Sequence, residues 1–194
     1  DSGRNFEPFT IYTSTNGNET VRRLASGDID NNGYTDIIFG DGKDVTILLN
    51  ERSNGTLSQR TLRLPSSFTR ISEIASADFN GDGQQDIAYT SWNTNETEIM
   101  LLTKNNSIIS RQIVGTSGSD IVASDLNLDG LPEIIVGGTV RVLENIGGMF
   151  KLGQALPNTV KNPALEGYSF ATGLMSPESI TVSDINLDGI PDIV

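Results

Sequence analysis

One nine-residue pattern, D-x-[DN]-x-[DN]-G-x-x-[DE], occurs four times in this chain, at residues 28–36, 78–86, 125–133 and 184–192. Oxygen-bearing side chains occupy positions 1, 3, 5 and 9 of every copy, and glycine always occupies position 6. A hard cation such as Ca²⁺ takes about six to eight oxygen ligands. Alternate residues of a tight turn can direct three oxygens at one point, and glycine permits the positive φ that turns the backbone around an ion. The pattern therefore predicts up to four calcium-binding loops.

The predicted ligands of each loop are the side chains at positions 1, 3, 5 and 9 and the backbone carbonyl at position 7. The first copy has Asp at position 3 and Asn at position 5, where the others have the reverse. Every copy thus carries three carboxylates, and we expect similar affinities. In chain order the predicted ligand residues are Asp28, Asp30, Asn32, Tyr34, Asp36, Asp78, Asn80, Asp82, Gln84, Asp86, Asp125, Asn127, Asp129, Leu131, Glu133, Asp184, Asn186, Asp188, Ile190 and Asp192.

The residues after each loop exclude an EF-hand, which needs Glu at position 12 and a helix behind it. Position 12 is Phe39, Tyr89 and Val136 in the first three copies. Short runs of β-branched and aromatic residues follow the loops instead, as at residues 36–40. Such runs predict strands.

The repeated unit is longer than the loop, since the first aspartates lie 50, 47 and 59 residues apart. A period of about 50 is typical of propellers and solenoids. The residue before the loop is always Gly, Ala or Ser, which suits an inner strand crowded by its neighbours. Third and fourth apolar runs follow, for example at residues 45–49 and 57–64. Four strands per repeat make one propeller blade.

The repeats resemble the FG-GAP/VCBS family, which includes the propellers of integrin alpha subunits and many secreted microbial proteins. Phe39-Gly40 and Val136-Gly137-Gly138 lie near the position of that family's name motif. The resemblance implies an all-β fold, a β-propeller of four-stranded antiparallel blades, with Ca²⁺ in the loop between strands 1 and 2 of a blade. It implies no single function, because this fold serves adhesion, sugar binding and accessory roles in enzymes.

A single propeller segment is expected over residues 1–194, and an open arc of blades would leave exposed strand edges. We therefore expect a partial ring; the alternative is a closed four-blade ring completed by residues 6–13. The predicted parts are a preceding fourth strand at about 1–20, blades at 21–66, 67–116 and 117–158, a long loop at 159–178 and half a blade at 179–194.

Composition excludes several classes of partner. The chain has 13 Lys and Arg against 25 Asp and Glu, and its net charge of −12 argues against nucleic acid and anionic membranes. Twelve of the acidic residues lie in the four loops, so the acidity belongs to the predicted metal sites. No apolar run approaches the roughly 18 residues of a membrane span. The chain has no cysteine and hence no disulfide.

The partner surface is predicted on the face opposite the calcium loops. The connections between second and third strands, and the long segment at 157–177, differ in length between repeats. Variable loops on a fixed scaffold often carry binding residues. Trp92, Tyr168 and Phe170 are the candidate contacts for a protein or glycan ligand. The alternative is that these side chains pack within their own loops.

Catalysis has little support, because the chain has no His and no Cys and half its carboxylates lie in the loops. We expect a non-enzymatic, calcium-stabilised module for adhesion or ligand recognition, extracellular or on the cell surface. The alternative is an accessory or partial domain of a secreted carbohydrate-active enzyme or lectin. N-x-[ST] sequons that would suit a secreted glycoprotein begin at Asn18, Asn54, Asn95 and Asn105.

Overall fold

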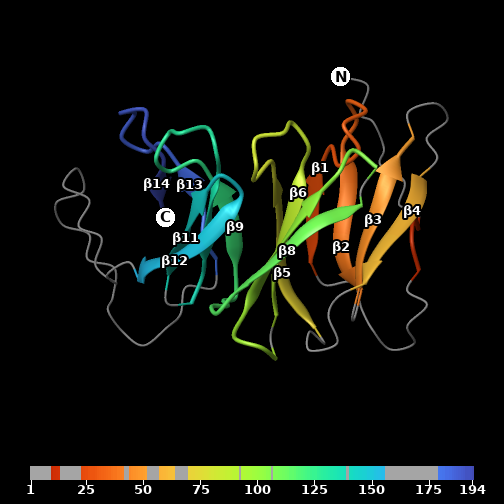
Figure 1. Cartoon of the computed structure of the whole chain (residues 1–194), viewed down its shortest axis with the longest axis horizontal. Helices are drawn as coiled ribbons and strands as arrows, with labels where there is room; N and C mark the ends of the chain where they lie inside the picture. Colours follow the sequence, from red (N-terminus) through yellow and green to blue (C-terminus); the bar gives the residue numbers. More distant parts are fainter. Residues whose placement is uncertain are drawn as a thin grey trace, which may run out of the picture.

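The computed structural model describes residues 10–13, 23–41, 44–51, 57–63, 70–91, 93–105, 107–138, 140–155 and 179–194. Within these residues every regular element is a β-strand. Three four-stranded sheets and one strand pair follow one another along the chain (Figure 1). The strands are β1 (Leu24–Gly27), β2 (Asp36–Asp41), β3 (Asp44–Asn50), β4 (Leu57–Arg63), β5 (Ile71–Ala77), β6 (Asp86–Ser91), β7 (Thr97–Leu102), β8 (Ile108–Val114), β9 (Ile121–Ser124), β10 (Glu133–Val136), β11 (Arg141–Ile146), β12 (Met149–Ala155), β13 (Val182–Ser183) and β14 (Asp192–Ile193).

Each sheet is an antiparallel meander in which every strand pairs with the next one along the chain. The register repeats between sheets, because the residue before each loop pairs with the last residue of the loop. Gly27 pairs with Asp36, Ala77 with Asp86, Ser124 with Glu133 and Ser183 with Asp192. The four acidic loops therefore all join the first and second strands of their sheets, and they lie along the upper edge of the view in Figure 1.

The hydrophobic core lies between sheets rather than within one. A first cluster joins Ile38 and Ile47 of the first sheet to Ile74 and Met100 of the second. A second cluster joins the second sheet to the third through residues such as Ile99 and Ile134. Because strand side chains alternate between the two faces, the second sheet can supply one face to each cluster. Burial of these apolar side chains is what holds the sheets side by side.

Two glycines permit the close approach of neighbouring sheets. A Cβ on Gly27 would lie 2.6 Å from Ser76 Oγ of β5, and one on Gly40 would lie 2.8 Å from Ile71 Cδ1. Both distances are shorter than side chains tolerate. The small residue before the first loop thus sits where β1 packs against β5, as its size predicts.

The predicted all-β fold of four-stranded antiparallel sheets is confirmed, and the described sheets do not close into a ring. A fourth strand of a preceding blade was expected at about 1–20, and its described part, residues 10–13, forms no strand. Tyr12 instead packs its ring against Phe39 of β2, with ring centroids 4.7 Å apart. This ring contact joins the stretch to the first sheet. The described residues contain no helix that is long and apolar enough to span a membrane.

Candidate metal loops

The aspartate at position 1 is the centre of each loop. In the first loop, Asp28 accepts hydrogen bonds from the backbone N–H groups of Asn32 and Gly33, at 2.9 and 2.8 Å. These two bonds fold the chain back over the carboxylate, and Gly33 adopts a φ of 87° to make this possible. The same pair of bonds forms in the other loops at Asp78, Asp125 and Asp184.

Positions 3 and 5 form an Asp–Asn pair in the first three loops. Asn32 Nδ2 donates to Asp30 Oδ2 at 3.1 Å, and in the second loop Asn80 Nδ2 donates to Asp82 Oδ2 at 3.1 Å. The reversed order of acid and amide in the first loop therefore leaves the pair intact. The position-5 oxygen also accepts the N–H of position 7, as between Asn32 Oδ1 and Tyr34 at 2.9 Å. An oxygen thus lies at each position where the sequence predicts a ligand.

The carboxylate at position 9 is a buried anchor as well as a predicted ligand. Asp36 and Asp86 are fully buried, and each accepts two backbone N–H groups. Asp86 Oδ2 accepts from Phe79 at 3.0 Å, and its Oδ1 accepts from Leu102 at 2.7 Å. Asp36 makes the corresponding bonds to Ile29 and Asn50. In the first two loops position 9 therefore ties the loop to the third strand of its sheet, a role that the ligand pattern alone does not predict.

Burial also changes the acidity of two loop carboxylates. Burial raises the pKa of Asp86 to about 7, against the lowering effect of its two backbone hydrogen bonds, and Asp82 and Asp78 raise it further. The pKa of Asp30 is raised chiefly by burial and next by the negative charge of Asp36. Both shifts indicate that these two loops hold their negative charges at a cost. A bound cation would relieve that cost.

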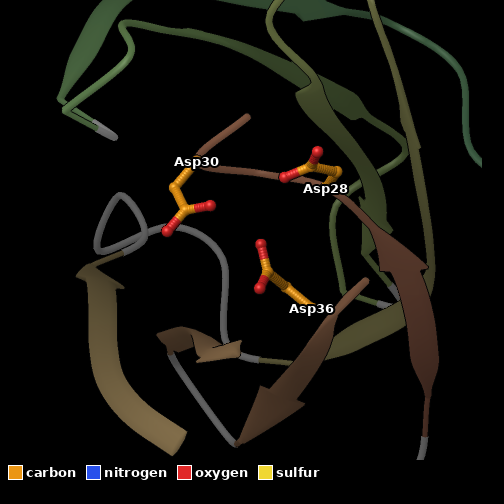
Figure 2. Close-up of side chains that lie close together, drawn as sticks. All are labelled: Asp28, Asp30 and Asp36. Atoms are coloured by element: carbon orange, nitrogen blue, oxygen red, sulfur yellow. The ribbon is translucent and has the colours of Figure 1, made fainter. Parts of the chain in front are cut away.

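In the first loop the carboxylates of Asp28, Asp30 and Asp36 point toward one another, with an oxygen of each within 4.8 Å of the others (Figure 2). Three carboxylates converge in this way in no other part of the chain that the structure describes. The difference follows from the sequence, because Asp30 supplies at position 3 the charge that the other loops carry at position 5. The donor set is entirely oxygen, which fits a hard cation such as Ca²⁺.

Neighbouring loops contact each other through side-chain amides. Asn31 Nδ2 donates to the carbonyl of Gly83 at 3.2 Å. Gln84, predicted as a ligand through its backbone carbonyl, extends its side chain to the first loop and donates from Nε2 to the carbonyl of Ile29. Gln84 is almost fully buried, which is unusual for glutamine unless its amide is engaged. The sequence pattern missed these contacts because it treats each loop by itself.

The third sheet makes an equivalent contact with the second loop. Asn145 of β11 donates from Nδ2 to the carbonyls of Phe79 and Pro132, at 2.8 and 2.9 Å. Asn145 is buried, and the ring of Phe79 packs edge-on against Phe150 of β12 at 5.4 Å. No pattern in the sequence signalled this contact between repeats. The predicted partner residues Trp92, Tyr168 and Phe170 lie outside the described residues.

The fold and the loops together define a class: a repeat protein of four-stranded antiparallel units, each with an oxygen-rich loop between its first two strands. The sequence model of the FG-GAP-like repeat family matches residues 28–89 and 78–136, together more than half of the chain. The chain belongs to this family, as the resemblance implied.

Among solved structures, the chain is similar to a chain in the Tc holotoxin pore of Photorhabdus luminescens. The TM-score is 0.51 at 16% sequence identity, and the match covers 88% of this chain. It covers 8% of the toxin chain, so this chain spans a small part of that protein's length. At this identity the likeness concerns the fold alone. No curated protein sequence matches the chain significantly.

Proposed function

We propose that the chain is a calcium-stabilised β-propeller module that serves extracellular adhesion or ligand recognition and has no catalytic activity of its own. The observation that carries the proposal is the convergence of Asp28, Asp30 and Asp36 in a loop whose hydrogen-bonding pattern recurs three times. Family membership agrees with it.

Calcium would act first on stability. The loops place twelve of the 25 acidic residues in four short turns, and four bound Ca²⁺ ions would change the net charge from −12 to −4. An ion that binds the native state alone stabilises it by RT ln(1 + [L]/Kd). At about 2 mM Ca²⁺ and a Kd of about 10⁻⁴ M, typical of extracellular modules, each loop would gain about 2 kcal/mol.

The recognition role would fall to the face opposite the loops. The loops are short turns whose backbone N–H groups donate hydrogen bonds to Asp28 and its counterparts, and this leaves them little freedom to vary. The connections at the other ends of the strands differ in length between repeats, and such loops are where binding surfaces arise. A protein or glycan is the proposed ligand.

The test is thermal unfolding in about 2 mM Ca²⁺ and in EDTA, with Mg²⁺ as the competing cation. We expect a higher midpoint in Ca²⁺ and a smaller effect of Mg²⁺, which keeps its water ligands more strongly. The variant Asp28→Asn with Asp30→Asn should lose part of the Ca²⁺ effect. The control Glu144→Gln, an exposed acid on β11, should keep all of it. Equal unfolding midpoints with and without Ca²⁺ would contradict the calcium proposal. The absence of binding to arrays of glycans and proteins would contradict the recognition role.

A further inference from the structure

Two of the four loops contain an Asn-Gly step, and two do not. Asn32-Gly33 spans positions 5 and 6 of the first loop, and Asn80-Gly81 spans positions 3 and 4 of the second. In the third and fourth loops the only asparagines, Asn127 and Asn186, are each followed by leucine. Glycine has no Cβ to hinder its backbone nitrogen, so an Asn-Gly step is the easiest place for that nitrogen to reach the side-chain amide.

The structure adds a proton acceptor to each of these steps. The backbone N–H of Gly33 donates to Asp28 Oδ2 at 2.8 Å, and that of Gly81 donates to Asp78 Oδ1 at 2.8 Å. These N–H groups are the ones that must lose their protons before the nitrogen can attack. A carboxylate at hydrogen-bond distance from the proton it would accept is the geometry of general-base assistance.

We propose that Asn32 and Asn80 are deamidation sites, at which spontaneous chemistry turns a three-carboxylate loop into a four-carboxylate loop. The consequence for calcium rests on the proposed function; the modification itself does not.

The reaction needs only water. The backbone nitrogen of the glycine forms a bond to Cγ of the asparagine, its proton passes to the carboxylate, and the bond from Cγ to Nδ2 breaks as ammonia leaves with a proton. Water then adds across one of the two carbon–nitrogen bonds of the cyclic imide. Cleavage on the side-chain side gives aspartate. Cleavage on the backbone side gives isoaspartate. No oxidation or reduction occurs.

The two products have opposite effects on the loop. Aspartate at position 32 or 80 completes an acid at each of positions 1, 3, 5 and 9, and this adds one negative charge beside Asp28 or Asp78. Calcium affinity should rise with the number of charged ligands. Isoaspartate inserts an extra carbon into the backbone, which displaces the N–H groups that converge on the position-1 aspartate. That product should bind calcium weakly.

The hydrogen bonds of the two asparagines predict which reacts first. Asn32 is held by its amide, which donates to Asn50 O at 3.0 Å and to Asp30, while its oxygen accepts from Tyr34. Asn80 has fewer restraints, since its amide donates to Asp82 and its oxygen accepts the N–H of the same residue. More of the Asn32 bonds must break before the side chain can rotate. Asn80 should therefore react faster.

The test is peptide mapping of the intact chain after incubation at neutral pH in EDTA, with mass spectrometry to detect the exchange of NH2 for OH. Tryptic peptides 24–43 and 71–104 carry Asn32 and Asn80, and 112–141 and 162–194 carry the controls Asn127 and Asn186. We expect conversion at Asn80 and Asn32 to be more than an order of magnitude faster than at the controls, with Asn80 ahead. Equal rates at all four asparagines would overturn the proposal.

Two comparisons separate the geometry from the dipeptide chemistry. Asp78→Asn should slow conversion at Asn80 in the native chain and leave it unchanged in the urea-denatured chain, where the carboxylate is no longer held against Gly81. An equal rate in both native proteins would overturn the assisting role of Asp78. Incubation in millimolar Ca²⁺ should slow both sites, because the ion would hold the side-chain oxygens and occupy the carboxylate. Fast conversion that Ca²⁺ leaves unchanged would support the modification and overturn the calcium assignment of these loops.

Discussion

The side-chain amide of Asn145 on β11 lies 2.8 Å from the carbonyl oxygen of Phe79, inside the acidic loop of the preceding sheet. Gln84 makes the corresponding bond to Ile29 one repeat earlier. In each case the residue at position 2 of a loop accepts at its carbonyl from the next repeat, from a loop residue in one case and a strand residue in the other. Its N–H goes to the position-9 carboxylate of its own loop. Position 2 is thus the point where a loop is joined to its neighbouring sheet.

Asn145→Ala should therefore loosen the joint between the second and third sheets. It leaves the buried carbonyl of Phe79 without this donor, which costs about 1–3 kcal/mol in the free energy of unfolding. Urea denaturation measures the loss. The matched control is Asn127→Ala, whose side chain bonds only within its own loop among the described contacts. A loss at Asn145 no larger than at Asn127 would contradict the role of this joint.

Asp86→Ala should harm the second loop more than Asn80→Ala. Asp86 is buried and accepts two backbone N–H groups, so its removal costs stability even without metal. It would also remove a charged ligand, whereas Asn80 supplies a neutral oxygen that water can replace. We expect a larger loss of calcium affinity by isothermal titration and a lower melting temperature in EDTA for Asp86→Ala. Matching losses in the two variants would refute this ranking.

The metal-free protein should become less stable as pH rises toward neutrality. Burial raises the pKa of Asp86 in the folded state to about 7 from its ordinary value of 3.8. A group whose folded pKa is raised contributes stability that is fully present below the unfolded pKa and is lost as pH rises through the folded pKa. The loss therefore falls between about pH 4 and pH 7. Melting temperatures in EDTA across this window measure it, and Asp86→Asn should flatten the slope. A slope unchanged by Asp86→Asn would assign the effect to other carboxylates.

The second sheet contains an ion pair between a buried carboxylate and a partly exposed arginine, which the other described sheets do not repeat. Glu98 is fully buried; it accepts from Arg111 Nη1 at 2.6 Å and from the hydroxyl of Tyr89. Burial raises the pKa of Tyr89, and the hydrogen bond to Glu98 raises it further. Arg111→Met should destabilise the fold by about 1–3 kcal/mol, because it leaves a buried carboxylate without its charged donor. Adding Glu98→Gln should recover part of the loss in urea denaturation. No recovery in the double variant would contradict the pairing.

The strands and the loops could be predicted from the sequence because both are local. The pattern at residues 28–36 fixes which N–H groups meet Asp28, and alternation after the loop fixes the strand. The contacts between repeats could not be predicted in the same way. Gln84 was expected to act through its backbone carbonyl, yet its side chain crosses to Ile29. Asn145 was expected in a turn, because it opens the Asn-Ile-Gly-Gly stretch at 145–148, yet it lies on β11. A single sequence does not reveal which carbonyl of a neighbouring repeat lacks a donor.

Charge counting was also too coarse for the first loop. Equal numbers of carboxylates predicted equal sites, whereas the positions of the charges decide whether they converge. Asp30 at position 3 lies with Asp28 and Asp36, while an acid at position 5, as in Asp82, accepts the amide of Asn80 and the N–H of position 7. Similar calcium affinity for the four loops remains a prediction. The first loop differs from the others in the convergence of its three carboxylates.

The edge-on contact between Phe79 and Phe150 has a consequence for how such a chain can change over generations. Phe79 belongs to the loop of one repeat and Phe150 to the fourth strand of the following repeat, so the contact depends on both repeats. A substitution at Phe79 alters the packing of two units, and a change at Phe150, 71 residues further along the chain, can offset it. The unit that selection preserves is then the junction between repeats, and relatives should vary in step at these two positions while the loops between them stay the same.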